Sequence, residues 1–205
     1  MIEQRERETY ETVWALRAYH NESPGRLYAP LFLQMIAPIV APAEHPWYAA
    51  EDYSILDAGC GAGDGAIELR THGFQKIKLC DITDEGLLED ALDYPFYQVA
   101  LWDSLNEKIG YMHGGKMDFV YCCDVLEHIP PHFTMLVVSR LLDISRYGVF
   151  LTISLLADNF GAWVGKPLHQ TLQSFSAWRD QLDTVGHVRE ARDLLGVGVY
   201  FVEPK

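Results

Sequence analysis

A glycine-rich segment just before residue 66 carries the clearest chemical signal in the chain. It follows an apolar run and leads into the helix-forming residues 66–70, and its alternate glycines are Gly59, Gly61, Gly63 and Gly65. Glycine lets the backbone turn sharply and approach a ligand with no Cβ in the way. The first N–H groups of the following helix are free and suit an anionic group. Because several nucleotide-binding families use such a turn, the segment alone does not identify the ligand.

Three carboxylates at expected strand ends narrow the choice of ligand. Asp57 lies inside the first expected strand, just before the glycine loop, where it can receive an ammonium group directly or through water. Asp81 ends the second expected strand, where an acid can hold both hydroxyls of a ribose. Asp103 follows Trp102 after the third expected strand, where a carboxylate and an aromatic ring can meet an adenine. The loop and the acids form a three-point match to one ligand with these parts.

Alternating apolar runs and helical segments must position these residues. From residue 53 the expected strands span 54–58, 76–80, 96–101, 117–123 and 148–155. The helices expected between them span 64–72, 84–92 and 131–145. Alternating β and α units of this length predict an α/β fold with a parallel, doubly wound sheet.

The two ends of the chain add helices and a hairpin. Near the C-terminus we expect a helix over 172–185 and two runs, 189–195 and 197–202, that pair antiparallel. Apolar and aromatic residues at helical spacing predict N-terminal helices over 2–20 and 27–40. We therefore expect residues 1–50 to form a helical cap on the ligand-binding part, residues 51–205, within a single domain.

With these elements the sequence resembles the class I S-adenosylmethionine-dependent methyltransferases, in particular their small-molecule branch. The resemblance spans about residues 53–204. The first family motif is matched by residues 56–63, Leu-Asp-Ala-Gly-Cys-Gly-Ala-Gly, and the acid after the second strand by Asp81. The fourth-strand motif is matched by residues 117–130, Met-Asp-Phe-Val-Tyr-Cys-Cys-Asp-Val-Leu-Glu-His-Ile-Pro. The resemblance implies a mostly parallel seven-stranded sheet with a terminal antiparallel hairpin. It also implies S-adenosylmethionine as cofactor and S-adenosylhomocysteine as product.

The resemblance also assigns residues to the parts of this cofactor. Those expected to face its methionine part are Asp57, Gly59, Cys60, Gly61 and Gly63. Asp81 and Ile82 are expected at the ribose, and Trp102 and Asp103 at the adenine. The floor near the sulfonium is expected to be Cys123 and Asp124, with His128 close by.

Two other functions fit part of this pattern. Residues 61–66 also match the dinucleotide fingerprint G-x-G-x-x-A, which an NAD-linked oxidoreductase would carry. Such a protein normally has no acid in the preceding strand, and the segment 124–128 would not be expected in it. A catalytically silent subunit that binds S-adenosylmethionine for a partner is the second alternative. The methyltransferase is favoured over both.

Methyl transfer from a sulfonium is an in-line displacement, so positioning supplies most of the catalysis. A general base is needed only when the acceptor loses a proton early, as a hydroxyl does. His128 and His169 are the candidates, and His169 is also expected to contact the acceptor. Trp163, in the loop after the fifth strand, and Tyr19, near the N-terminus, are the other expected acceptor contacts. Glu127 is interpreted as a solvated or hydrogen-bonded acid at a helix start.

Composition excludes several partners. The net charge is −13, with 29 acidic against 16 basic residues, which disfavours nucleic acid and anionic membrane surfaces. A small-molecule acceptor is therefore expected. Base-methylating motifs are missing after the fourth strand, where residues 123–126 are Cys-Asp-Val-Leu. The oligomeric state, the acceptor and the methylated atom stay open.

The four cysteines and the chain start indicate a compartment. Cys60, Cys80, Cys122 and Cys123 lack the spacing of a disulfide framework or a zinc knuckle, and we expect no metal. They are interpreted as buried thiols in a reducing cytosol. The first residues are charged where a signal peptide is apolar, and no long apolar run predicts a membrane span. A cytoplasmic location is therefore expected.

Overall fold

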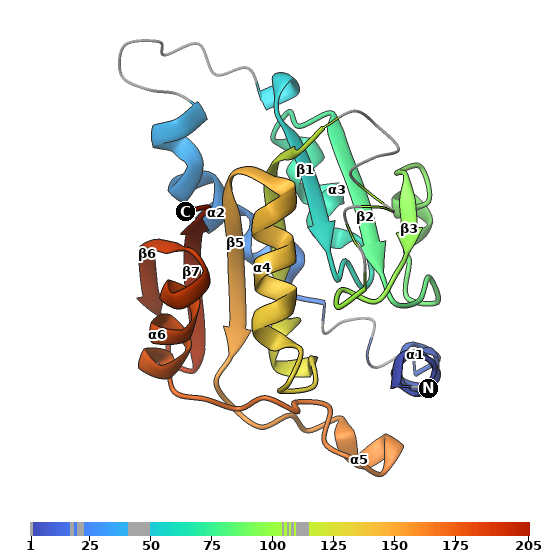
Figure 1. Cartoon of the computed structure of the whole chain (residues 1–205). Coiled ribbons are helices and arrows are strands. Elements are labelled where there is room, and N and C mark those ends of the chain that lie inside the picture. Colours follow the sequence, from blue (N-terminus) through green and yellow to red (C-terminus); the bar gives the residue numbers. More distant parts are fainter. Residues whose placement is uncertain are drawn as a thin grey trace.

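A seven-stranded sheet organises the part of the chain that the structure describes, which is residues 2–16, 19, 23–40, 50–103, 105, 107, 109 and 115–205. In this computed structural model the strand order is β3-β2-β1-β4-β5-β7-β6 (Figure 1). The strands are β1 (Ser54–Ala58), β2 (Lys76–Asp81), β3 (Phe96–Gln98), β4 (Met117–Cys123), β5 (Ser145–Ser154), β6 (His187–Asp193) and β7 (Val197–Glu203). β7 pairs antiparallel with β5 and β6, and the other pairs are parallel. The predicted mostly parallel sheet with a terminal antiparallel hairpin is confirmed.

Helices cover both faces of this sheet. The packing on one face comes from α2 (Gly25–Val40) and α3 (Asp64–Thr71), and on the other from α4 (Thr134–Ile144) and α6 (Phe175–Val185) (Figure 1). Every residue of β4 is buried as a result. Strands that are covered on both faces have continuous apolar runs instead of an alternating pattern, and this is how the sequence showed them.

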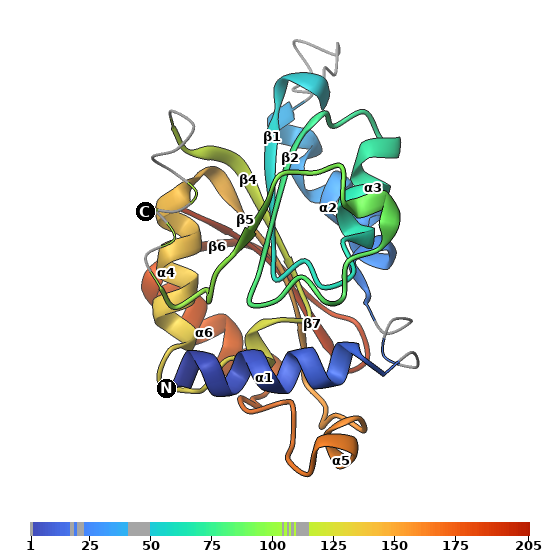
Figure 2. The same ribbon diagram turned by 90° about the vertical axis from the view of Figure 1, so that its right-hand side faces the viewer.

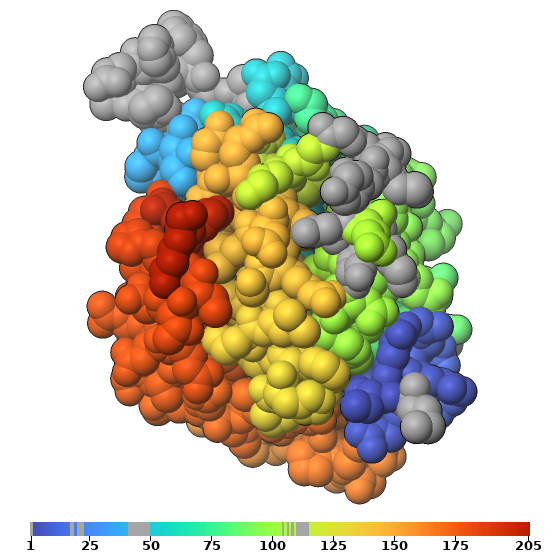
Figure 3. All heavy atoms as spheres, viewed as in Figure 1, coloured from blue at the N-terminus to red at the C-terminus, as the bar shows by residue number. Residues whose placement is uncertain are grey.

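The first helix, α1 (Ile2–Trp14), lies across the carboxyl ends of the strands (Figure 2). It contacts α5 (Gly161–Val164), and the two helices lie next to each other at this end of the molecule (Figure 3). The prediction extended the first helix to residue 20, but the helix ends at Trp14, and residues 17, 18 and 20 lie outside the described part. Ligands of open α/β sheets bind at this edge, so α1 covers the expected site.

The second helix is part of the core. α2 buries Phe32, Met35 and Ile36 against the sheet, so of the two helices expected in the cap only α1 lies over the strand ends. Its first residue, Gly25, packs on Gly65, and the hydroxyl of Tyr121 donates to the Gly25 carbonyl at 2.5 Å. The start of α2 is thereby fixed to the start of α3.

The prediction of a helix over 84–92 is wrong. This segment forms only a single 3-10 turn, η3 (Glu89–Ala91). The N–H of Leu88 donates to the carbonyl of Ala62 at 3.1 Å, so the backbone of the segment supports the glycine loop instead of its own helix. Gly86, which has the lowest helix propensity of the segment, lies against the indole of Trp14.

Other element boundaries move by a few residues. β3 ends at Gln98 instead of residue 101, and β5 begins at Ser145 instead of 148. α4 begins at Thr134, after the two prolines that open the expected helix, and α6 begins at Phe175. The hydroxyl of Ser174 caps α6 by accepting the N–H of Ala177 at 3.2 Å.

Candidate active site

The glycine loop between β1 and α3 needs residues without side chains. Gly59 and Gly61 have φ angles of 70° and 52°, in the left-handed region. A Cβ on Gly59 would lie 2.5 Å from Cγ2 of Val125, and one on Gly61 would lie 2.8 Å from Cζ2 of Trp14. The backbone of the loop therefore forms one wall of the site, in contact with α1 and with the segment after β4.

Asp81, at the end of β2, fixes this wall. Its Oδ2 accepts the N–H of Gly61 at 2.9 Å, and its Oδ1 accepts the N–H of Ile82 at 2.6 Å. Burial raises the pKa of Asp81, although these bonds and one from Thr83 oppose the shift. A carboxylate can accept about four hydrogen bonds, so Asp81 keeps acceptor capacity for a ligand.

Asp57 lies beneath the loop. Its Oδ2 accepts the N–H of Ala66 in the first turn of α3 at 3.1 Å. The residue is 3% exposed, and burial raises the pKa of its carboxyl well above the usual range. It packs beside Gly65 and Tyr121 and lines neither of the two cavities described below. Its contact with an ammonium group therefore stays a prediction.

A first cavity of about 630 Å³ opens at the glycine loop. Seven of the residues predicted to hold the cofactor line it: Gly59, Gly61, Asp81, Ile82, Trp102, Asp124 and His128. Residues that the sequence analysis did not assign to the cofactor complete the lining: Glu6, Tyr10, Trp14, Tyr19, Val99, Ala100, Leu101, Val125 and Ile129.

Four other residues predicted at the cofactor do not line this cavity. Cys60 and Cys123 are 5% and 8% exposed, and burial raises the pKa of both thiols well above the usual range. Gly63 faces Ala91 in the turn that supports the loop. Asp103 is half-buried, and its N–H donates to the carbonyl of Ala100 at 2.9 Å. These residues surround the site instead of facing it.

The flat ring of Trp102, which lines the first cavity, is held in a fixed orientation. This ring stacks on Phe133, with centroids 5.4 Å apart and an angle of 8° between the planes. This stacking fixes the orientation of the indole and favours a planar ligand group beside it.

Three aromatic residues reach the site from the N-terminal part of the chain. Tyr19, the predicted contact, packs edge-on against Trp14 at 4.8 Å between ring centroids, and Tyr10 packs edge-on against His128 at 5.9 Å. The sequence analysis assigned no site role to Tyr10 and Trp14, yet both line the first cavity.

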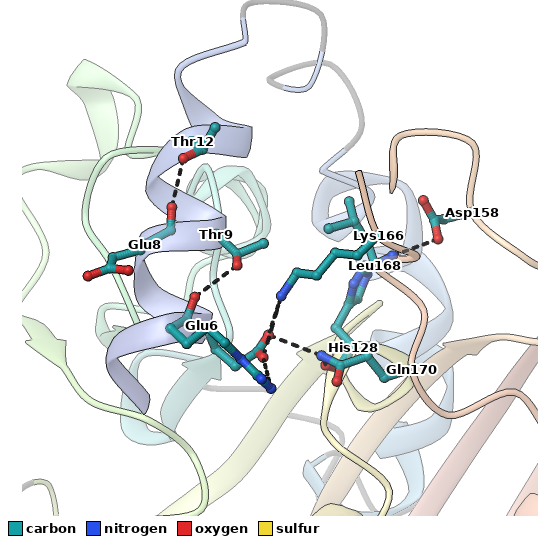
Figure 4. Close-up of polar contacts among 10 residues, drawn as sticks. Glu6, Glu8, Thr9, Thr12, His128, Asp158, Lys166, Leu168 and Gln170 are labelled. Atoms are coloured by element: carbon teal, nitrogen blue, oxygen red, sulfur yellow. Dashed lines mark hydrogen bonds and ion pairs between the residues drawn. The ribbon is translucent and has the colours of Figure 1, made fainter. Parts of the chain in front are cut away.

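Glu6 is a further residue of the site for which the sequence alone gave no role. It is 2% exposed and lines the first cavity from α1. Its carboxylate forms an ion pair with Lys166 at 3.3 Å and accepts from Nε2 of Gln170 at 3.1 Å (Figure 4). Glu6 shares a helix face with Tyr10 and Val13, and this spacing was the signal that could have identified it.

A second cavity of about 570 Å³ lies beyond the first. Its lining residues come mainly from the segments after β4 and β5, and they are Tyr19, Asp124, His128, Ser154, Ala157, Asp158, Asn159, Phe160, Leu168 and His169. Tyr19, Asp124 and His128 line both cavities. The two cavities therefore meet at these three side chains.

Asp158 organises the loop around the second cavity. Its carboxylate accepts the N–H of Leu168 at 2.8 Å and that of His169 at 3.1 Å, and it also accepts the N–H of Gly161. These bonds from three backbone groups lower the pKa of Asp158. Trp163, which was predicted to contact the acceptor, is 71% exposed on α5 and lines neither cavity.

His128 and His169 face each other where the cavities meet. Their rings are perpendicular, with centroids 4.7 Å apart. Nδ1 of His169 lies 2.6 Å from the carbonyl oxygen of Leu156, so Nδ1–H donates to this carbonyl and Nε2 is the ring nitrogen left for other partners. Burial lowers the pKa of His128 to about 4, which keeps that ring neutral at neutral pH. Two imidazole rings, of which His128 is neutral, therefore stand at the junction.

Glu127 is the hydrogen-bonded acid at a helix start that was one of the two alternatives from the sequence, and it is not solvated. It is fully buried in η6 (Leu126–His128), and its Oε1 accepts the N–H of Ser154. Burial and the neighbouring charge of Asp124 raise the pKa of Glu127 well above the usual range. Its backbone carbonyl accepts the N–H groups of Gln170 and Thr171 at 2.7 and 2.9 Å. These bonds tie the loop around the second cavity to the segment after β4.

Comparison with known proteins agrees with this geometry. The family model described as a methyltransferase domain matches residues 2–195, so the chain belongs to the methyltransferase domain family. The enzyme uses S-adenosylmethionine, and the alternative of an NAD-linked oxidoreductase is therefore excluded. No curated protein sequence matches the chain significantly. Within the described residues, no helix has the length and apolar character needed to cross a membrane.

Solved structures share the fold at low sequence identity. One is magnesium protoporphyrin IX methyltransferase from Synechocystis PCC 6803 with bound SAH, with 20% identity, a TM-score of 0.54 and coverage of 84% of this chain and 83% of that one. The DhpI–SAH complex has 13% identity, a TM-score of 0.57 and coverage of 88% and 93%. An O-methyltransferase family protein from Burkholderia thailandensis has 16% identity, a TM-score of 0.57 and coverage of 94% and 61%.

Proposed function

We propose that this methyltransferase binds S-adenosylmethionine in the first cavity and methylates a small or medium-sized molecule in the second. The observation that carries this proposal is the junction between the cavities. Tyr19, Asp124 and His128 line both of them, so a group held in one cavity can meet a group held in the other.

The residues of the first cavity fit the cofactor. The loop at Gly59 and Gly61 packs so closely on Val125 and Trp14 that a Cβ would clash, and Asp81 presents a carboxylate with spare acceptor capacity to the cavity. We assign Asp81 to the ribose hydroxyls and Trp102, on its Phe133 support, to the adenine. Asp57, beneath the loop, is assigned to the ammonium group through an intervening water.

The residues of the second cavity position the acceptor. S-adenosylmethionine supplies an electrophilic methyl group, and the protein must hold the nucleophile in line with it. Tyr19, Asp158 and His169 bring polar groups from separate segments of the chain to this cavity. Asp158 organises the loop and the other two are assigned to the acceptor, whereas Trp163 points away from the cavity and is no longer assigned to it.

The charge of the site favours acceptors without phosphate groups. Glu6, Asp124 and Asp158 line the cavities, and the cations Lys166 and Arg5 are both already paired with Glu6. The whole chain carries a net charge of −13. Nucleic acid and other polyanions are therefore poor acceptors.

Calorimetric titration with S-adenosylhomocysteine, and with NADH as the control ligand, tests the first half of the proposal. We expect one site for the former and no binding of NADH. Release of S-adenosylhomocysteine with a panel of phenols, amines and carboxylic acids then tests the second half. A protein that binds neither ligand, or only NADH, would contradict the proposal, and turnover on oligonucleotides alone would contradict the choice of acceptor.

A further inference from the structure

The junction of the two cavities brings together three groups that can bind a metal ion. They are Asp124, directly after β4, His128 in η6 and His169 in the loop after α5. One ligating atom from each residue lies within 4.8 Å of the others. The sequence separates His169 from the other two by two helices and a strand, so no spacing motif reveals the set.

His169 is oriented as metal-binding histidines usually are. Its Nδ1–H donates to the carbonyl of Leu156 at 2.6 Å, and its backbone N–H donates to Asp158 at 3.1 Å. Histidine ligands commonly donate the second ring N–H to a carbonyl, which fixes the tautomer and aims the other nitrogen. Nε2 of His169 is thereby left with a free lone pair.

His128 and Glu127 contain buried polar atoms whose hydrogen-bonding capacity is unused. Nδ1 of His128 and Oε2 of Glu127 are buried and have no hydrogen-bond partner among the described residues. Glu127 is fully buried beside the half-buried Asp124, so two carboxyl groups stand next to each other. Such a group of acceptors is costly unless a proton or a cation joins it.

Asp124 is held in an uncommon conformation that points to a fixed role. It is one of two non-glycine residues with positive φ in the described part of the chain, with a φ of 59°. Its N–H donates to the carbonyl of Thr152 at 2.9 Å, which ties it to β5. Residues in this region concentrate at functional sites, where the surrounding structure maintains the strain.

We propose that Asp124, His128 and His169 bind one divalent transition-metal ion at the junction of the cavities, where it also binds an acceptor hydroxyl. Two imidazoles and one carboxylate favour ions such as Zn²⁺, Co²⁺ or Fe²⁺ over Mg²⁺ and Ca²⁺. Three protein ligands leave a coordination position open. This inference narrows the acceptor to molecules with a hydroxyl group, and it rests on the proposed function.

The ion gives the reaction a source of the nucleophile. A bound hydroxyl becomes more acidic on the metal and releases its proton to water in the second cavity. The oxygen then forms a bond to the methyl carbon while the carbon–sulfur bond breaks, and the electron pair stays on sulfur. The products are a methyl ether, neutral S-adenosylhomocysteine and one proton, and the metal ion is unchanged.

Titration of the chelator-treated, dialysed protein with Co²⁺ tests the site without any need for turnover. We expect one equivalent to bind, with visible d–d bands from nitrogen and oxygen ligands and no thiolate charge-transfer band. His169→Ala and Asp124→Asn are expected to lower Co²⁺ affinity by more than about tenfold. His132→Ala is the matched control, because His132 is exposed on the Pro131–Phe133 turn and lines neither cavity, and its Co²⁺ binding is expected to match the wild type.

The outcomes separate this proposal from the proposed function. Absence of stoichiometric Co²⁺ binding, or equal binding by His169→Ala and the wild type, overturns the metal site. Titration with S-adenosylhomocysteine in the same metal-free preparations shows whether each variant is folded and binds the cofactor. If the cofactor binds and the metal does not, the metal proposal fails alone. If the cofactor product does not bind to the wild type, the proposed function fails.

Discussion

The cofactor side of the site is built from backbone groups of adjacent strands and turns, whereas the acceptor side is built from side chains of distant segments. On the first side, Asp81 holds the N–H groups of Gly61 and Ile82. On the second, His128 packs edge-on against His169, which lies far away in the sequence. A substitution on the first side should therefore act on cofactor affinity, and one on the second should act on the acceptor.

The largest effect is expected at the glycine loop. Gly61→Ala places a Cβ against Trp14 at a positive φ, at a cost of about 2–3 kcal/mol, which corresponds to about a thirty- to hundredfold loss of S-adenosylhomocysteine affinity. Calorimetric titration measures it. Gly165→Ala is the matched control, since Gly165 also has a positive φ of 72° but has open space around its Cβ position. An equal loss of S-adenosylhomocysteine affinity in both variants would show that backbone strain causes the loss, and that the contact of the loop with Trp14 does not.

Asp81→Ala is the next largest. Loss of this charged acceptor is expected to weaken S-adenosylhomocysteine binding by about 1–3 kcal/mol, because two loop N–H groups and the ligand lose their partner. Asp90→Ala, at an exposed acid of η3, is the control in the same titration. Unchanged affinity in Asp81→Ala would remove Asp81 from the cofactor site.

Asp57→Asn is expected to separate stability from binding. Burial raises the pKa of Asp57, so its contribution to stability is present below about pH 4, the unfolded value, and is lost as pH rises through the folded value. We expect urea unfolding to show a gain of about 1 kcal/mol for the variant at pH 7, which narrows toward pH 4. Cofactor affinity should fall. A variant that is less stable than the wild type at pH 7 would show that the Ala66 bond outweighs burial.

Glu6→Ala gives the smallest effect, and it falls on the other side. Loss of the contacts to Lys166 and Gln170 is expected to raise the KM for the acceptor by about two- to threefold, or up to about 0.7 kcal/mol, because α1 no longer holds the loop around the second cavity. Glu8→Ala, on the exposed face of the same helix, is the control. If the KM of Glu6→Ala matches that of the control, the acceptor side does not depend on this contact.

The same difference explains which features the sequence predicted. The strands and the glycine loop have local signals, because buried parallel strands are continuous apolar runs and the loop needs glycine where φ is positive. The helix expected over 84–92 failed because its Leu88 N–H is used by Ala62 of the loop, which is a tertiary contact. Local propensity does not contain such contacts.

The acceptor side has no local signal of this kind. His128 and His169 meet only because the segments after β4 and β5 end at the same edge of the sheet and Asp158 folds the loop back. The sequence could nominate both histidines singly, but their perpendicular contact at 4.7 Å depends on the fold. Trp163 shows the converse, since an aromatic residue in the right loop faces outward on α5.

The buried carboxylate of Glu6 has a thermodynamic consequence. It lines the cavity assigned to the cofactor, and the same group binds Lys166 and Gln170 of the loop that encloses the other cavity. Gln170 also donates to the carbonyl of His128 at 3.0 Å, so one chain of contacts spans both ligands (Figure 4). If bound cofactor changes the affinity for the acceptor by some factor through these contacts, bound acceptor must change the affinity for the cofactor by the same factor. The order in which the two ligands bind therefore cannot change their total binding free energy, and only the rates distinguish one order from the other.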